Sequence, residues 1–178
     1  MSALPDRRQE KTRQAIGQAF LAMLFEQSYN VITIAAVAER ANVGRSTFYE
    51  HFRTKSDLLK HSLETPFGAL ASVISESETP AFLVPLLQHF RDNHALGRVL
   101  FGGPTRAVLH RVLASHIENH LPPDLPLPRT LLAGQIASAQ LALLEPWSLG
   151  QVAASAETMA RTLHRTSTAL ARAAAETA

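Results

Sequence analysis

Apolar residues recur every three or four positions along most of the chain, which is the spacing of one face of an α-helix. In the first such segment, residues 7–26, they are Ile16, Ala19, Phe20, Met23 and Leu24. Two shorter helices are predicted over about residues 33–40 and 44–51. Asn42 lies between them and tolerates a left-handed backbone better than most residues. These segments predict a three-helix module near the N-terminus.

The rest of the chain is also predicted to be helical. A fourth helix runs from Lys55 to about residue 64, bends near Pro66 and continues to Ile74, because a proline inside a helical pattern kinks or ends it. Thr79 is predicted to cap the next helix, which Pro85 can divide. Later helices are predicted near 96–100 and over 105–120, 129–144 and 155–173, with breaks at 101–104, 122–128 and 146–150. No stretch alternates as a strand would, so the predicted fold class is all-α.

Size and composition restrict the class of protein. The chain has 178 residues, of which 46% are hydrophobic, enough for one large or two small domains with a packed core. No apolar run reaches the length of a membrane span, and the basic N-terminus lacks the apolar stretch of an export signal, so we expect a cytoplasmic protein with no membrane partner. The absence of Cys excludes disulfides and thiolate chemistry.

Charge alone is poor evidence for a nucleic-acid partner. The net charge is only +2, and the basic residues up to Lys60 are mixed with acidic ones. Without a motif, such a mixture is more typical of a solvated face.

The segment from Thr33 to Leu58 supplies that motif, because it predicts two short helices joined by a tight turn. The residues that define it are Gly44, Arg45, Ser46, Thr47, Phe48, Tyr49, Glu50, His51, Phe52, Lys55 and Leu58. With the flanking residues from about 7 to 63, it resembles the DNA-binding domain of TetR-type transcriptional regulators. Asn42 and Gly44 replace a commoner Gly and a commoner Ser at these positions, so the second short helix begins with a weaker cap.

The predicted DNA contacts lie in or beside the two short helices and are Thr33, Arg45, Ser46, Thr47, Tyr49, His51 and Lys55. Arg45 is the candidate base reader, because a guanidinium can bind both acceptors of guanine, and a phosphate contact is its alternative role. Tyr49, Lys55 and Thr33 are predicted to hold phosphates, with packing the alternative for Tyr49 and helix capping for Thr33. His51 can reach either a phosphate or a base.

Metal and enzyme chemistry are not predicted. His116 and His120 share one helix face as paired zinc ligands do, but the metalloprotease motif requires a Glu directly after the first His. Glu118 is two residues on and points to the other side of the helix. No nucleophile with an adjacent base and no carboxylate pair is visible, so we predict no metal, no cofactor and no enzyme. A helical binding module, or an enzyme that uses the helix-turn-helix only as scaffold, is the alternative.

The resemblance implies an all-α homodimer with a DNA-binding domain over residues 1–54 and an effector-binding and dimerisation domain over 55–178. The predicted effector pocket lies among the middle helices and comprises Phe82, Leu86, His89, Phe90, Phe101, Arg106 and His110. The predicted dimer interface lies on the last two helices and comprises Ala137, Met159, Leu163 and Leu170. An ordinary intrachain core is the alternative for both sets. The implied function is a repressor that binds a roughly palindromic operator in double-stranded DNA and leaves it when a small apolar or amphipathic ligand binds.

Overall fold

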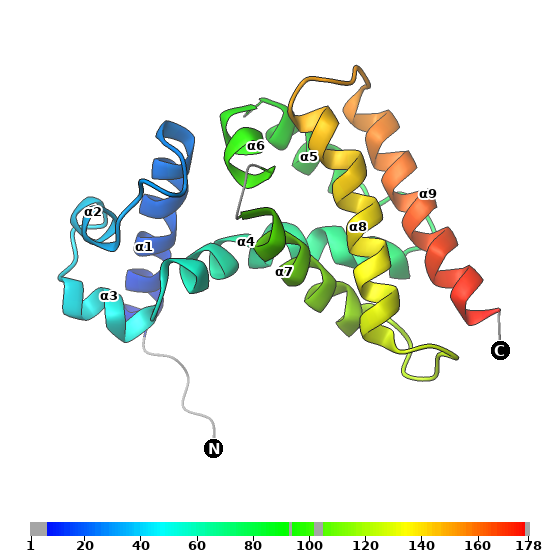
Figure 1. Ribbon diagram of the computed structural model, residues 1–178, viewed down its shortest axis with the longest axis horizontal. Helices are drawn as coiled ribbons and strands as arrows, with labels where there is room; N and C mark the ends of the chain where they lie inside the picture. Colours follow the sequence, from blue (N-terminus) through cyan, green and yellow to red (C-terminus); the bar gives the residue numbers. More distant parts are fainter. Residues whose placement is uncertain (1–6, 93, 102–104, 177–178) are drawn as a thin grey trace. The chain divides into compact units, whose positions relative to one another are not determined.

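The structure, a computed structural model, describes residues 7–92, 94–101 and 105–176. Over these residues the chain forms helices and no β-strand, so the predicted all-α class is confirmed (Figure 1). The helices are α1 (Arg7–Glu26), α2 (Ile34–Arg40), α3 (Arg45–His51), α4 (Lys55–Ser72), η1 (Val73–Ser75), α5 (Leu83–Asp92), α6 (His94–Phe101), α7 (Thr105–His120), α8 (Arg129–Ser148) and α9 (Ala156–Ala175). None of the described helices is long and apolar enough to cross a membrane.

Two compact units make up the chain, Met1–Leu63 and Glu64–Ala178. Their division falls inside α4, whereas the sequence predicts a boundary between residues 54 and 55. The first turns of α4 belong to the first unit, because Leu58 and Leu59 are fully buried and the His61 ring lies 5.4 Å from the Phe52 ring. Helix α4 is therefore shared by both units.

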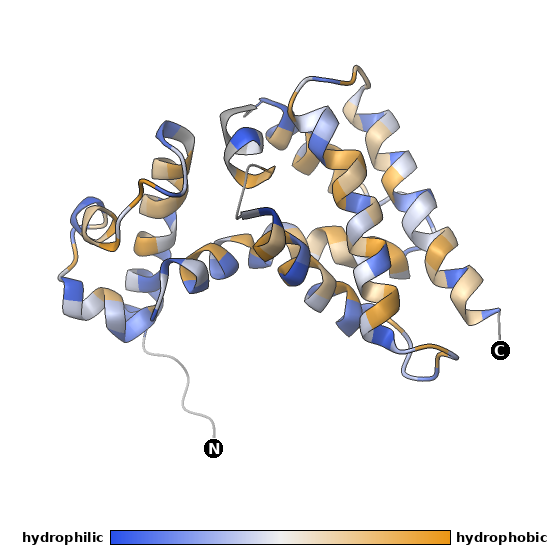
Figure 2. Cartoon of the chain, viewed as in Figure 1, coloured by the Kyte–Doolittle hydropathy of each residue, from blue (hydrophilic) through white to orange (hydrophobic). Residues whose placement is uncertain are grey.

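The first unit is built on the apolar face of α1. Ile16, Phe20 and Leu24 follow one another at four-residue steps and are fully buried. Figure 2 shows hydrophobic and hydrophilic residues alternating along this helix. At its end, both carboxylate oxygens of Glu26 accept hydrogen bonds from Arg40 at 2.5 and 2.7 Å, which joins α1 to the end of α2. This pair is exposed, so its contribution to stability is small.

In the second unit, α8 packs against both α7 and α9 (Figure 1). The fully buried Gln140 of α8 joins three helices. Its Nε2 atom donates to the carbonyl oxygen of Leu70 in α4 at 3.2 Å and to the hydroxyl of Ser167 in α9 at 3.0 Å. Because a buried backbone carbonyl needs a donor, Gln140 holds the second half of α4 against the core of this unit.

The start of α5 differs from the prediction. Thr79 does not cap this helix, which begins only at Leu83; its hydroxyl instead lies 3.3 Å from Nδ1 of the buried His164 in α9. Pro85 does not divide the helix, because it lies in the first turn, where a backbone N–H would have no partner within the helix.

The end of α8 also differs, because the helix continues through Pro146 to Ser148 instead of ending before it. Trp147 is buried and its Nε1 donates to the carbonyl oxygen of Ala154 at 2.9 Å, which holds this last turn in place. The helix ends at Ser148, and Gly150, two residues on, has a φ of 72°, the left-handed conformation that commonly follows a helix end. Tertiary packing of Trp147 thus outweighs the helix-breaking tendency of Pro146.

Candidate nucleic-acid interface

The turn between α2 and α3 has the geometry that the sequence predicts. Asn42 adopts a φ of 54°, and the next residue, Val43, donates from its backbone N to the carbonyl oxygen of Ala38 at 2.9 Å. Helix α3 then begins after Gly44, which as a glycine supplies no side-chain hydrogen bond to the first turn. The left-handed residue redirects the chain so that α3 packs against α2, which in turn packs against α1.

Helix α3 has one buried face and one exposed face. Phe48 and Phe52, four residues apart, are buried in the core of the unit. At about 100° per residue, Ser46 and Glu50 lie roughly opposite these rings. Both are exposed, as are Arg45 and the Tyr49 ring, which is 55% exposed. The outer face of α3 therefore presents a guanidinium, a hydroxyl, a carboxylate and a phenol from one short rigid element.

The other predicted contacts surround this face. Thr47 and His51 are half-buried on α3, and Thr33 is exposed at the start of α2. The Thr33 hydroxyl oxygen accepts a hydrogen bond from the backbone N of Ala36 at 3.2 Å, so Thr33 is the cap of α2. A hydroxyl that accepts in this way still has its own proton to donate, so capping and phosphate contact are compatible.

Lys55 lies differently from its prediction as a phosphate contact. Its Nζ donates to the backbone carbonyl oxygens of Tyr29 at 2.6 Å and Ile32 at 2.8 Å, and lies 4.2 Å from the centre of the Tyr29 ring. Burial lowers the pKa of this ammonium group. The side chain is directed to the chain's own backbone.

Two features of this region escaped the sequence analysis. Glu50 is exposed beside Ser46, and its position four residues after Ser46 was the available signal. Thr54 and Asp57 cap α4 reciprocally, because each backbone N donates to the other's side chain at 3.0 Å. The spacing of Thr54 and Asp57 is that of a capping box, and it fixes the residue at which α4 begins.

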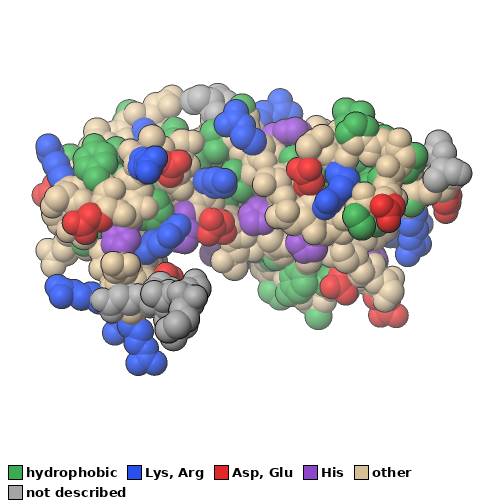
Figure 3. Space-filling view, turned by 90° about the horizontal axis from the view of Figure 1, so that it is seen from below, with side chains coloured by type: hydrophobic (Ala, Val, Ile, Leu, Met, Phe, Trp, Pro, Cys, Tyr) green, Lys and Arg blue, Asp and Glu red, His purple; other side chains and the backbone are tan. Residues whose placement is uncertain are grey.

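The charges around α3 are mixed. Figure 3 shows one face of the molecule, on which Lys and Arg side chains are interspersed with Asp and Glu. The exposed cations near α3 in sequence are Arg40 before it, Arg45 within it, and Arg53 and Lys60 after it. Arg40 is paired with Glu26, which reduces its availability to another anion. A local group of cations, and not a strongly basic surface, accompanies the exposed face of α3.

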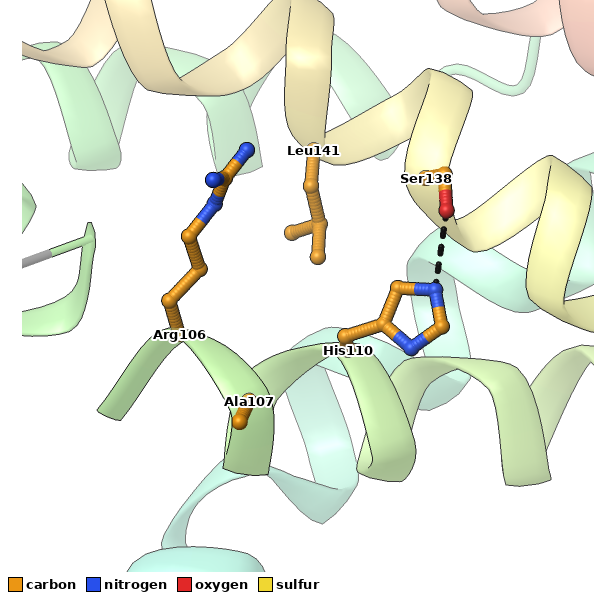
Figure 4. Close-up of a pocket in the computed structure, with 5 residues that line it drawn as sticks. All are labelled: Arg106, Ala107, His110, Ser138 and Leu141. Carbon is orange, nitrogen blue, oxygen red and sulfur yellow. Dashed lines mark hydrogen bonds between the residues drawn. The ribbon is translucent and has the colours of Figure 1, made fainter. Parts of the chain in front are cut away.

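A groove of about 440 Å³ lies between α7 and α8 in the second unit. It is lined by Arg106, Ala107, His110, Ser138 and Leu141 (Figure 4). Two of the predicted effector residues, Arg106 and His110, are among them. The other predicted residues belong to α5, α6 or the turn before α5; they are Phe82, Leu86, His89, Phe90 and Phe101. Phe82 is 43% exposed, whereas Phe90 is buried.

The groove has polar groups at both ends and an apolar wall. His110 Nε2 lies 3.0 Å from the Gly134 carbonyl oxygen and 2.9 Å from the Ser138 hydroxyl (Figure 4). Because a carbonyl only accepts, Nε2 carries the proton. At the other end, Arg106 forms an ion pair of 3.2 Å with Glu145, and Leu141 lies between the two ends. A volume of this size fits a small molecule.

The predicted interface residues lie mostly inside the chain. Ala137 and Leu163 are fully buried, Met159 is buried and Leu170 is half-buried. A partner subunit could not reach the first three side chains without unpacking this core. The outer side of α8 instead carries an exposed stripe at helical spacing that comprises Leu131, Gln135, Ser138 and Ala142. The exposed residues Thr158, Arg165 and Ala169 form a similar stripe on α9.

At the end of α7, a histidine ring lies against the backbone of its own helix. His120 Nδ1 lies 2.9 Å from the carbonyl oxygen of His116, one turn earlier in the same helix. No group of three or more metal-ligating side chains occurs among the described residues.

Known regulatory proteins are similar to this chain in sequence and in fold. The family model described as bacterial regulatory proteins of the tetR family matches residues 18–61. YxbF of Bacillus subtilis (strain 168), an uncharacterised HTH-type transcriptional regulator, is 34% identical over 76 residues, which are 42% of this chain and 20% of YxbF. The chain thus spans about a fifth of that relative's length.

Solved structures extend the similarity over both units. A TetR-family regulator from Streptomyces coelicolor has a TM-score of 0.64 at 17% identity, covering 96% of this chain and 99% of that one. A TetR transcriptional regulator from Streptococcus agalactiae has a TM-score of 0.59 at 28% identity, covering 91% and 96%. The fold similarity therefore includes the helices that follow the sequence match.

Proposed function

We propose that the chain is a TetR-type regulatory protein and not an enzyme, and that it acts as a homodimeric, cytoplasmic repressor released from DNA by a small ligand. Its partner is a roughly palindromic operator in double-stranded DNA. The observation that carries the proposal is the exposed polar face of α3, opposite the buried rings of Phe48 and Phe52. A mobility-shift titration with duplex DNA from upstream of the gene tests it, and absence of any specific shift would favour a binding module that does not use DNA.

Base reading is assigned to the outer face of α3. A helix of this kind enters the major groove with its first turns toward the base edges. There Arg45 can donate to both acceptors of guanine, Glu50 can accept from the amino group of cytosine, and Ser46 can do either. Tyr49 and Thr33 have hydroxyls that can donate hydrogen bonds to DNA phosphates. Thr47 and His51 lie at the edge of the exposed face of α3.

Arg45→Ala and Glu50→Ala are expected to alter sequence preference in different ways. Arg45→Ala should relax preference at one position of each half-site, at about 1 to 3 kcal/mol per contact. Glu50→Ala should relax preference at another position and also raise affinity for unrelated DNA, because it removes a negative charge near phosphates. Selection of bound fragments from random duplex DNA, followed by titration on substituted operators, measures both effects. A uniform loss of affinity in Arg45→Ala would make Arg45 a phosphate contact.

Dimerisation is assigned to the outer faces of α8 and α9. The α8 stripe contains a small side chain at Ala142, which lets another helix approach closely, and an apolar residue at Leu131 that is 63% exposed. Two copies paired through these faces would be related by a two-fold axis, as a palindromic operator requires.

The effector site is assigned to the groove between α7 and α8. The apolar wall at Leu141 and the Arg106 side chain, which stays 59% exposed in spite of its ion pair with Glu145, favour a small amphipathic molecule with an anionic group. The helices that line the groove also hold the second half of α4, since Gln140 binds the Leu70 carbonyl oxygen. A ligand that prefers one arrangement of these helices would shift the population of α4 positions, and operator affinity would change with it.

A ligand that occupies this groove should raise thermal stability and lower operator affinity over the same concentration range, because both effects follow from one binding event. At a concentration 100 times the Kd, the stabilisation should be about 2.7 kcal/mol. A thermal-shift screen of amphipathic carboxylates, followed by operator titration with each hit, measures both.

Arg106→Ala should raise the Kd of anionic hits about tenfold or more, since a charge-assisted hydrogen bond is lost. Arg111→Ala is the matched control, because Arg111 is exposed on the same helix but does not line the groove. Ligands that stabilise the protein without changing operator affinity would argue for a regulator controlled in another way.

A further inference from the structure

Lys55 occupies a cage that the chain builds from its own atoms. Two backbone carbonyl oxygens, of Tyr29 and Ile32, accept hydrogen bonds from Nζ at 2.6 and 2.8 Å. The Tyr29 ring lies on another side of Nζ, with its centre 4.2 Å away. Carbonyl oxygens and the face of an aromatic ring all attract a cation, so these three groups form a complete binding site for an ammonium ion.

This cage leaves little of the ammonium group for DNA. A Lys Nζ has three N–H donors; two of them are directed to carbonyls, and the ring takes up a further side. The Lys55 side chain is half-buried, whereas Lys60, one turn and a half later on α4, is exposed. A phosphate contact by Lys55 would require the two short hydrogen bonds to be exchanged for a screened ionic contact.

The cage joins elements that are distant in sequence. Tyr29 and Ile32 belong to the connection between α1 and α2, which ends at Thr33, the cap of α2. Ile32 is buried in the core of the unit, so its carbonyl has a fixed position. Lys55 is the first residue of α4. Its side chain therefore ties the start of α4 to the residues directly before α2.

We propose that Lys55 is a positioning residue for DNA binding, which clasps residues 29–32 to the start of α4 and does not contact a DNA phosphate. The proposal rests on the DNA-binding function proposed above. In this proposal, the Lys55 side chain holds α2, and with it α3, in a fixed position relative to the start of α4. Any movement at the start of α4 is then passed to the helix-turn-helix through this side chain.

Lys55→Met keeps the aliphatic stem and removes the ammonium group, and Tyr29→Leu removes the ring. Operator affinity of both variants and of the double variant is measured by titration at several salt concentrations. Lys55→Met should weaken binding about tenfold, with an unchanged slope of log affinity against log salt. Loss of a phosphate contact would instead reduce that slope by about 0.9. Lys60→Met, on an exposed Lys of the same helix, is the control for removing a positive charge.

Energetic coupling between Lys55 and Tyr29 gives a second, independent result. If Lys55 acts through the cage, the double variant should lose little more than Lys55→Met alone, both in operator affinity and in the midpoint of thermal unfolding. Either a salt slope reduced by about 0.9 in Lys55→Met or additive losses in the double variant would overturn the proposal. If Lys55→Met does not fold, the same double-variant comparison is made with Lys55→Arg. This substitution keeps the positive charge but places a larger guanidinium group in the cage.

The test separates this proposal from the proposed function. If the wild-type protein binds no duplex DNA, the proposed function fails. The thermal unfolding midpoints of the two single variants and the double variant still decide whether Lys55 acts through the cage. Coupled thermal losses would support it, and additive losses would overturn it. If wild type binds DNA and the salt slope falls in Lys55→Met, the clasp fails and the DNA-binding function stands.

Discussion

Ala142→Arg is expected to convert the proposed dimer into folded monomers and to weaken operator binding by about a hundredfold or more. Ala142 is exposed on the outer stripe of α8, so a long charged side chain fits there in a single chain. In a dimer paired through this stripe, the same charge would be buried without a partner, which is strongly unfavourable. Light scattering measures the mass, circular dichroism the helix content, and titration the operator affinity.

Ala137→Arg is the matched control on the same helix. Ala137 is fully buried within the chain, so the new charge disrupts the core of the second unit and should destabilise it by more than about 4 kcal/mol. Loss of helical circular dichroism in Ala137→Arg and its retention in Ala142→Arg would distinguish core from interface. An intact dimer in folded Ala142→Arg would place the interface on other helices.

Phe48→Ala is expected to unfold the first unit and thereby abolish DNA binding. The Phe48 ring is fully buried, and its centre lies 5.9 Å from that of the Phe52 ring. Truncation of a buried Phe costs about 3 to 5 kcal/mol, a large part of the stability of a unit of this size. Two-dimensional NMR or hydrogen exchange of α1–α3 amides would detect the loss directly.

Tyr49→Ala, one residue later, should leave the unit folded and weaken binding to all sequences alike, because the exposed phenol is assigned to a phosphate. The Tyr49 ring contacts the Phe48 ring edge-on at 5.7 Å, so a small loss of stability is expected as well. A change in sequence preference in Tyr49→Ala would show that this residue reads a base. Unfolding of Tyr49→Ala would show that its role is packing.

The helical periodicity in the sequence predicts most of the fold. It predicts α1 and α7 with the bounds that the structure has, and in the sequence α7 is also flanked by the Gly and Pro residues of 102–104 and 122–123. The prolines were less informative. Pro85 and Pro146 were expected to interrupt helices, but one lies in a first turn and the other is followed by the buried Trp147. The effect of a proline depends on its position within the helix and on the packing around it, and neither follows from the sequence alone.

The candidate site could likewise be predicted only in part from the sequence. Arg45, Ser46 and Tyr49 could be predicted as exposed, because Phe48 and Phe52 define the buried side of the same short helix. The partners of Lys55 could not, since Tyr29 and Ile32 come from a connection whose path no periodicity describes.

The last two helices could not be resolved from the sequence either. Ala137 and Leu163 lie on apolar faces, but a helix between its own core and a partner has two such faces. Only the packing of one chain reveals which face is already covered.

The hydrogen bonds of Gln140 have a consequence for synthesis on the ribosome. They connect this residue with Leu70, 70 positions earlier, and with Ser167, 27 positions later. The second unit therefore cannot complete its core until α9 has left the exit tunnel, whereas the first unit has all its packing partners once Leu63 has emerged. In the nascent chain, the helix-turn-helix can therefore fold before the surfaces assigned to dimerisation are formed.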